Sequence, residues 1–256
     1  MANVDVFVFM GQSNMAGRGI TTPAHPESAP TAIDGAGWEY RAVTAPDRLS
    51  TLCEPFGRDE NRPGGIDDGV KKTGSMVTAF VNEYFSRTGR QVIAVSASEG
   101  GTSILQWQPD GRLLPDAVAR IHAVRRYCAE NNITPGGIYM LWCQGETDGD
   151  HGMTPDEYTE KFGKMYAVLR EAGIERCFLV NIGHYNGPLS TDYTPIMDAI
   201  RALPTQIETT ALVCDVFASM KARGLMKDDF HYFQQAYNEA GTVAARETAK
   251  LLDYSK

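Results

Sequence analysis

The chain has 256 residues, of which 43% are hydrophobic and 22% are charged, and its formal net charge is −8. This length and composition are typical of a globular protein with a well-buried core. An acidic chain has no electrostatic attraction for a phosphate backbone, which argues against nucleic acid as a partner. No apolar run approaches the roughly 20 residues that span a bilayer, so no membrane partner is expected either.

The five cysteines are widely spaced, and none forms a Cys-x-x-Cys pair or a Cys/His cluster with zinc spacing. We therefore predict no metal site. Cys143, Cys177 and Cys214 lie inside apolar runs, which favours buried free thiols and a reducing, cytoplasmic setting; one disulfide stays open as the alternative. The N-terminus has no basic segment ahead of its first apolar run, so no signal peptide is expected.

The first element is an apolar run over residues 4–10 that ends at Gly11 and is followed by Gln12, Ser13 and Asn14. Its length and its content of β-branched and aromatic residues predict a buried strand. Ser13 would then lie at the carboxyl end of this strand, the edge where open α/β sheets bind their ligands. The simpler interpretation is an ordinary strand and turn that happen to contain a serine.

Residues 18–73 are rich in Gly, Pro, Asp and Thr and show little periodicity. A segment of this length without regular elements is usually either functional or disordered. Its aromatic side chains, which include Trp38, Tyr40 and Phe56, argue against disorder. We expect an ordered excursion that covers part of the active face.

Four further apolar strands alternate with helices over the rest of the chain. Strands are expected at 92–95, 138–143, 177–183 and 210–216, and helices at 74–88, 115–131, 155–172, 191–203 and 232–252. None of the five strands alternates between apolar and polar residues, which is typical of a parallel sheet covered by helices on both faces. The sequence therefore predicts one domain over residues 1–256, an α/β three-layer sandwich with a five-stranded parallel sheet in the flavodoxin-like order 2-1-3-4-5.

Polar residues or glycines follow several of these strands directly, such as Gly100 after the second and Gln144 after the third. Near the C-terminus, Asp228 precedes His231 by three residues. In a turn, this spacing lets the carboxylate reach the Nδ1–H group of the imidazole and leaves Nε2 free to act as a base. Together with Ser13, the pair supplies the nucleophile, base and orienting group of acyl-transfer chemistry.

Four sequence blocks resemble those of the SGNH-hydrolase superfamily, in the branch of the sialate O-acetylesterases and the acetylxylan esterases of carbohydrate esterase family 6. The blocks are Gly11-Gln12-Ser13-Asn14-Met15, Glu99-Gly100-Gly101-Thr102-Ser103, Gln144-Gly145-Glu146-Thr147-Asp148 and Asp228-x-x-His231-Tyr232. They occur in the family order over residues 4 to about 245, and the first block is the most specific. The Gly-x-Ser-x-Gly elbow of α/β-hydrolases is absent from the sequence.

The resemblance implies a serine esterase that hydrolyses O-acetyl esters of a carbohydrate, such as acetylated xylan or sialic acid, without a metal or an organic cofactor. By position, Ser13 matches the nucleophile, His231 the base and Asp228 the carboxylate that orients the base. The oxyanion hole of the superfamily would be formed by the N–H groups of Ser13 and Gly100 and by the side-chain amide of Gln144. The reaction would be a two-step acyl transfer through an acetyl-Ser13 intermediate.

Glu146 has two alternative roles beside these groups. It would brace Gln144, which is the role we favour here, or replace Asp228 as the partner of the histidine. Gln12 and Asn14 would support the nucleophile from behind.

Four residues near the strand ends are candidates for substrate contact: Trp107, His151, His184 and Arg18. Trp107 would stack on a sugar ring or, alternatively, anchor a loop in the core. Arg18 would pair with the carboxylate of a sialic acid, and the two histidines would touch the sugar. The alternative for these three residues is a place on the surface without a function.

Two other functions are compatible with the sequence. The first is a carbohydrate-binding or virion-surface module that has kept the fold but lost turnover, although all four blocks are intact. The second is a broad-specificity lipase or thioesterase of the same superfamily. The lack of a long apolar stretch in residues 18–73 argues against long acyl chains.

Overall fold

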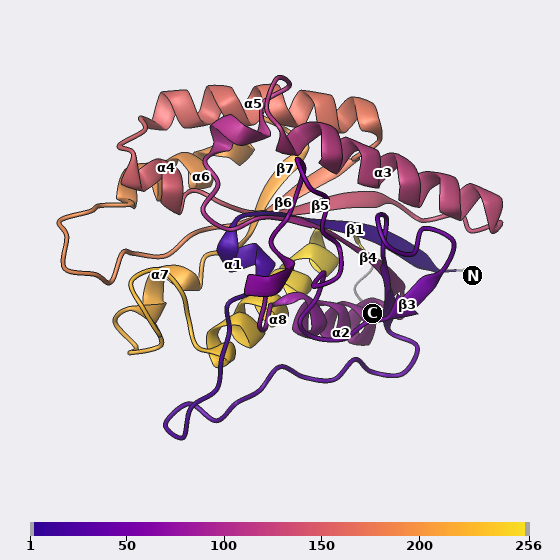
Figure 1. Ribbon diagram of the computed structural model, residues 1–256, viewed down its shortest axis with the longest axis horizontal. Coiled ribbons are helices and arrows are strands. Elements are labelled where there is room, and N and C mark those ends of the chain that lie inside the picture. The colour runs from indigo at the N-terminus through magenta and orange to yellow at the C-terminus, as the bar shows by residue number, and fades with distance from the viewer. Residues whose placement is uncertain (1–2, 254–256) are drawn as a thin grey trace.

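A computed structural model describes residues 3–253, and a single seven-stranded sheet runs through its centre (Figure 1). The strands are β1 (Val4–Gly11), β2 (Gly37–Tyr40), β3 (Leu49–Thr51), β4 (Gln91–Ser98), β5 (Ile138–Cys143), β6 (Arg176–Val180) and β7 (Thr210–Cys214). The α-helices are α1 (Ser13–Ala16), α2 (Val77–Thr88), α3 (Leu113–Glu130), α4 (Glu146–Asp150), α5 (Pro155–Ala172), α6 (Thr194–Gln206), α7 (Phe217–Met220) and α8 (Gln234–Leu251), and two 3-10 helices are η1 (Gly69–Lys71) and η2 (Ile104–Trp107).

The five predicted strands lie side by side in the predicted order. The sheet runs β3-β2-β4-β1-β5-β6-β7, and the five strands from β4 to β7 are mutually parallel, which confirms the 2-1-3-4-5 arrangement. Met10 is in register with Ala97 on one side and with Trp142 on the other. The carboxyl ends of β1, β4 and β5 therefore meet at one edge of the sheet.

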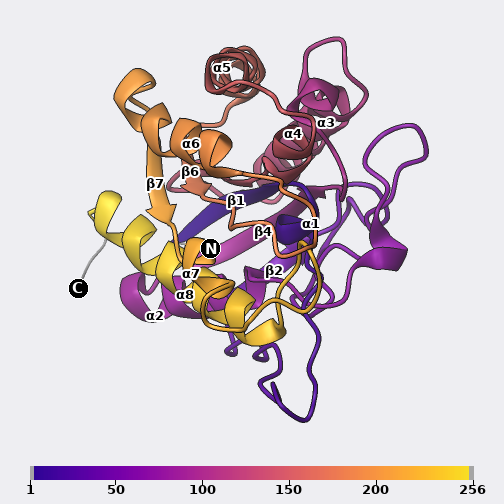
Figure 2. The same ribbon diagram turned by 90° about the vertical axis from the view of Figure 1, so that its left-hand side faces the viewer.

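Helices cover both faces of the sheet, and β1 shows why its sequence does not alternate in polarity. Phe7 and Phe9 point into the core that β1 shares with α2 and α8, whereas Val6 and Val8 point into the core shared with α3, α5 and α6. Figure 2 shows these two groups of helices on opposite sides of the sheet. Because both faces of each central strand are buried, both sets of alternating positions are apolar.

The excursion over residues 18–73 differs from the expectation of a segment without regular elements. It contributes β2, which adds to β4 in parallel, and β3, which pairs with β2 in the antiparallel direction. Each strand is only three or four residues long, which is too short for a periodic pattern to be read from the sequence. The sheet therefore has two more strands than predicted.

The predicted helices are present, with small differences at their ends. Helix α6 extends past Pro204 to Gln206, because the N–H group of Ile207 still donates to the carbonyl of Leu203. Helix α5 begins as the sequence suggests: Thr154 and Glu157 form a reciprocal capping box ahead of it.

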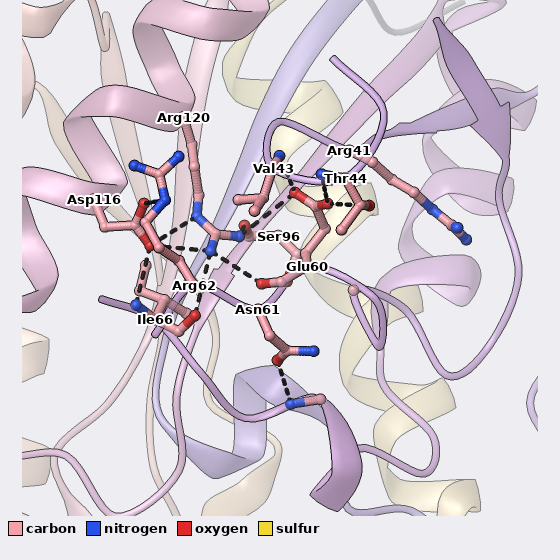
Figure 3. A network of polar contacts seen from close by, with 12 residues as sticks. Arg41, Val43, Thr44, Glu60, Asn61, Arg62, Ile66, Ser96, Asp116 and Arg120 are labelled. Atoms are coloured by element: carbon pink, nitrogen blue, oxygen red, sulfur yellow. Dashed lines mark hydrogen bonds and ion pairs between the residues drawn. The ribbon is translucent and has the colours of Figure 1, made fainter. Parts of the chain in front are cut away.

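A fully buried arginine ties the excursion to the body of the protein (Figure 3). Arg120 of α3 donates to the carbonyls of Ser96 at 2.8 Å and of Glu60 at 3.0 Å, and to the carboxylate of Asp116. Asp116 in turn accepts a hydrogen bond from the N–H group of Ile66 at 3.0 Å. The segment that precedes η1 is thus held by charged hydrogen bonds rather than by apolar packing alone.

All five cysteines are free thiols, with Cys53 exposed and the other four buried. Among the helices within residues 3–253, none combines the length and the apolarity that crossing a bilayer requires.

Candidate active site

The site begins where β1 passes into α1, at a turn that only glycine can make. Gly11 has φ +139°, and a Cβ atom there would lie 2.0 Å from the carbonyl oxygen of Cys143 on β5. An L-residue would be strained in this conformation and would also clash with the neighbouring strand. The close approach lets the chain turn at once into α1, which places Ser13 at the sheet edge.

Three side chains from opposite ends of the chain meet at this edge. The Oγ atom of Ser13 lies 2.9 Å from Nε2 of His231. Nδ1 of His231 lies 3.0 Å from each carboxylate oxygen of Asp228. Asp228 also accepts hydrogen bonds from the backbone N–H groups of Phe230 at 2.9 Å and of His231 at 2.7 Å, which fix the carboxylate within its turn. The structure therefore brings together the three residues that the sequence predicts to act together.

The surroundings of the pair favour a neutral imidazole beside an ionised carboxylate. Burial lowers the pKa of His231 below its ordinary value of 6.5, against the opposing influence of Asp228. Burial acts to raise the pKa of Asp228, but the hydrogen bonds from Phe230 and His231 outweigh it, so the pKa falls below 3.8. At neutral pH, Nε2 of His231 is thus able to accept the proton of the Ser13 hydroxyl.

A cavity of about 310 Å³ opens directly over Ser13 and His231. Its wall carries charged side chains of both signs among apolar surface. It is lined by Gln12, Ser13, Arg18, Lys71, Gly100, Gly101, Glu146, Thr147, Asp150, Phe230 and His231. Such a concave site with convergent polar groups is suited to a small polar ligand.

Asn14 lies immediately behind the nucleophile position and is completely buried. Its Nδ2 group donates to Oε1 of Glu146 at 2.5 Å and to the carbonyl of Phe230 at 3.1 Å, and its Oδ1 atom accepts from the Tyr237 hydroxyl at 2.6 Å. Asn14 therefore connects α1 to the turn that carries the histidine and to α8. These contacts agree with the supporting position expected from the sequence.

The expectation that Glu146 braces Gln144 is wrong. Glu146 bonds to Asn14 instead, and it has no contact with Asp228 or with the imidazole of His231 among the interactions of residues 3–253. Burial raises its pKa to about 7, and Oε2 is buried without a hydrogen-bond partner in the described part of the chain. Asp148 takes the bracing role, because it accepts a hydrogen bond from Gln144.

The three groups expected to form the oxyanion hole differ in whether another residue already accepts their hydrogen bonds. The Ser13 N–H group has no acceptor among residues 3–253. Gly100 lines the cavity, but its N–H group donates to Oδ2 of Asp68 at 3.0 Å. Gln144 is completely buried and does not line the cavity. Gln12, which we expected only to support the nucleophile, lines the cavity instead.

Three of the four predicted substrate contacts do not reach the cavity. Trp107 is completely buried and packs edge-on against Trp142, so it is a core residue, as its alternative interpretation held. His151 and His184 are exposed and lie outside the cavity lining. Arg18 does line the cavity, but it forms an ion pair of 2.5 Å with Asp68.

Several residues of the site carry no signal that the sequence alone would reveal. Asp68 and Lys71 come from the excursion, Phe230 from the turn before His231, and Asp150 from α4. The proximity of Phe230 to the predicted base is the one clue available for this group. Within residues 3–253, no cluster of three or more His, Cys, Asp or Glu side chains is placed to hold a metal ion.

A family model and a curated relative that match this chain both describe carbohydrate esterases. A family model described as "Carbohydrate esterase, sialic acid-specific acetylesterase" matches residues 3–250. The chain is 24% identical over 257 residues to the probable carbohydrate esterase At4g34215 of Arabidopsis thaliana, covering 94% of this chain and 88% of the relative.

Solved structures share the fold. The structure of the Arabidopsis thaliana protein AT4G34215 superposes with a TM-score of 0.67 at 22% identity, covering 98% of this chain and 99% of the other. The carbohydrate acetylesterase XAC1771 from Xanthomonas citri superposes with a TM-score of 0.62 at 15% identity, covering 96% of this chain and 55% of the other. NanS superposes with a TM-score of 0.58 at 13% identity, covering 98% of each chain.

Proposed function

Because the chain belongs to the sialic acid-specific acetylesterase family of carbohydrate esterases, and is therefore a carboxylic-ester hydrolase of the SGNH type, we propose that it removes O-acetyl groups from a carbohydrate through an acetyl-Ser13 intermediate. One observation carries this proposal: Ser13 Oγ, His231 and Asp228 form a continuous hydrogen-bonded chain at 2.9 and 3.0 Å. The substrate class, an acetylated glycan such as acetylated xylan or sialic acid, follows the family.

In the first step, His231 Nε2 takes the proton from the Ser13 hydroxyl while Oγ forms a bond to the acetyl carbon. The carbonyl oxygen gains the negative charge, and the free N–H group of Ser13 supports it. When this intermediate collapses, the bond from carbon to the sugar oxygen breaks. The sugar hydroxyl leaves with the proton from His231, and the acetyl group stays on Ser13.

In the second step, water takes the place of the sugar. His231 removes a proton from the water, which attacks the acetyl carbon, and the bond to Ser13 Oγ breaks as the proton returns to the serine. Acetate is released. Asp228 holds the imidazole in the tautomer that presents Nε2 to the serine, and it stabilises the imidazolium that forms in each step.

Hydrolysis of p-nitrophenyl acetate, together with acetate release from acetylated xylan and from O-acetylated sialic acid, tests the proposal. The wild type should release p-nitrophenol, and Ser13→Ala should abolish this release while leaving the melting temperature within a few degrees. A wild type that is inert towards every acetyl ester, with a Ser13→Ala variant that binds the same glycans equally well, contradicts it. In that case the chain is a binding module.

Acyl-chain preference is tested on the same assay. The cavity over Ser13 is small, at about 310 Å³, and charged side chains border it, so p-nitrophenyl acetate should be hydrolysed at least tenfold faster than p-nitrophenyl octanoate in kcat/KM. Equal or faster hydrolysis of the octanoate favours a broad lipase or thioesterase.

A further inference from the structure

Gln12 and Gln144 both carry amide groups at the end of the central strands, but only Gln12 faces the cavity over Ser13. Gln144 is completely buried. Its Nε2 group has three acceptors, which are the carbonyl of Thr102 at 2.9 Å, Oε1 of Gln12 at 3.2 Å and the carboxylate of Asp148. A primary amide has two N–H bonds, so Gln144 has none left for a substrate.

The orientation of the Gln12 amide is fixed by its partners. Its Oε1 atom faces the backbone N–H groups of Gly145 at 3.2 Å and of Thr147 at 3.4 Å, besides Nε2 of Gln144. Backbone N–H groups can only donate, so the atom that faces them must be the carbonyl oxygen. The NH₂ group of Gln12 therefore points away from this cluster.

That NH₂ group has no acceptor within residues 3–253. Its nitrogen, Nε2, is also absent from the fully buried side-chain atoms that lack a partner there, so it is not closed off from the cavity that Gln12 lines. Gln12 directly precedes Ser13, whose own N–H group is also free of an acceptor in the described chain. Two unused donors on adjacent residues thus border the cavity beside the Ser13 hydroxyl. An oxyanion hole needs donors that are held in place beforehand and left open for the developing charge.

We infer that Nε2 of Gln12 is the side-chain donor of the oxyanion hole, in the place that the resemblance to SGNH hydrolases gives to Gln144. Gln144 is then a positioning residue that holds Oε1 of Gln12. This inference rests on the proposed esterase reaction. It predicts that the amide of Gln12 binds the oxyanion of both tetrahedral intermediates.

Two variants separate the donor from the other properties of Gln12. Gln12→Glu keeps an oxygen for Gly145 and Thr147 but replaces the donor by a negative charge. Gln12→Met keeps the site neutral but loses the oxygen as well as the donor. The missing donor is the one change that the two variants share, so the inference predicts a loss of similar size in both.

Both variants should lose about 10²- to 10³-fold in kcat for p-nitrophenyl acetate, with KM changed less than threefold. Rates are normalised to the Ser13 that reacts with a fluorophosphonate titrant, so that partial unfolding does not count as lost chemistry. The inhibition constant of a short alkyl boronic acid, whose adduct with serine mimics the tetrahedral intermediate, should rise in proportion to the loss in kcat.

A loss of kcat in Gln12→Glu alone would be due to the added charge. A loss of kcat in Gln12→Met alone would be due to the missing oxygen that accepts from Gly145 and Thr147. Either result overturns the inference. If the methionine variant does not fold, an unchanged boronic acid inhibition constant in Gln12→Glu overturns it. The proposed function fails separately, through a wild type without esterase activity or a Ser13→Ala variant that retains it.

Discussion

The carboxylate of Asp68 accepts a hydrogen bond of 3.0 Å from the backbone N–H group of Gly100, beside the nucleophile position. A Cβ atom built on Gly100 would lie 3.2 Å from Cβ of Ser13, so the two residues are close neighbours. The same oxygen of Asp68 also accepts from Arg18 at 2.5 Å, while Oδ1 is buried without a partner among the described residues. The excursion thus places a negative charge where the reaction would develop one.

Replacing Asp68 by asparagine should raise kcat for p-nitrophenyl acetate about threefold to tenfold and lower the melting temperature. The rate rises because a fixed charge that opposes the oxyanion is removed. Stability falls because Arg18 loses its buried counter-ion. Asp67→Asn, the same change at an exposed neighbour, is the control and should change kcat less than twofold. A fall in kcat for a folded Asp68→Asn protein contradicts this account.

The pH dependence of kcat/KM should report the neutral form of His231. Burial lowers the pKa of this imidazole below 6.5, so activity should rise with pH and reach half of its plateau below pH 6.5. In Asp228→Asn the rate should fall by about 10²- to 10⁴-fold, because the favoured tautomer is lost. Its midpoint should also move to lower pH, because Asp228 acts to raise the pKa of His231. A midpoint that moves upward is the contrary result.

Glu146 should make folding stability depend on pH. Burial raises its pKa to about 7 from an ordinary 4.5, so the folded protein binds this proton more tightly than the unfolded chain. The stability that this bound proton contributes to the folded protein is fully present below pH 4.5 and is lost as the pH rises through 7. Glu146→Gln keeps an oxygen for Asn14 and removes the buried charge. It should stabilise the protein at pH 8 by on the order of 3 kcal/mol.

Urea unfolding of Glu146→Gln at pH 4.5 and pH 8 checks this expectation, with Glu160→Gln on the exposed face of α5 as the control. The stabilisation should be absent at the lower pH. A difference in the free energy of unfolding that is the same at both pH values shows that ionisation of Glu146 is not its cause.

Arg120→Met should destabilise the protein by about 3 kcal/mol, because the buried carboxylates of Asp116 and Glu60 lose the cation between them and Asp116 keeps only Arg62, at 3.2 Å, as an ionic partner. The carbonyl of Ser96 also loses its donor. Urea unfolding measures the loss. Arg48→Met removes an arginine whose side chain is 66% exposed and should change the free energy of unfolding by less than about 0.5 kcal/mol. Equal effects of the two variants would show that the buried network contributes no stability.

Apolar runs and short motifs were sufficient to predict the central sheet and the meeting of Ser13, Asp228 and His231. Runs such as residues 138–143 are long enough to carry the signal of a buried strand. The additional strand β2 has four residues and is defined by its pairing with β4, a contact between distant segments that local sequence does not encode.

The side-chain contacts were harder to predict, because they depend on where each amide or carboxylate points. Gln12 and Gln144 are chemically identical, and only their partners determine which of them opens to the cavity. The third sequence block placed Glu146 at the site, directly after β5. Its hydrogen bond with Asn14, however, joins residues that are 132 positions apart in the chain. Directions of this kind follow from tertiary packing rather than from spacing along the chain.

Ser13 and His231 are separated by 218 positions in the chain and by 2.9 Å in space. The strand that carries the serine is the first element, and the histidine lies just ahead of the last helix, α8, which packs against α2. Contacts of such long sequence separation slow folding, because the entropy of closing a long loop must be overcome before they form. Recovery of esterase activity after dilution from denaturant would therefore time the completion of the native fold.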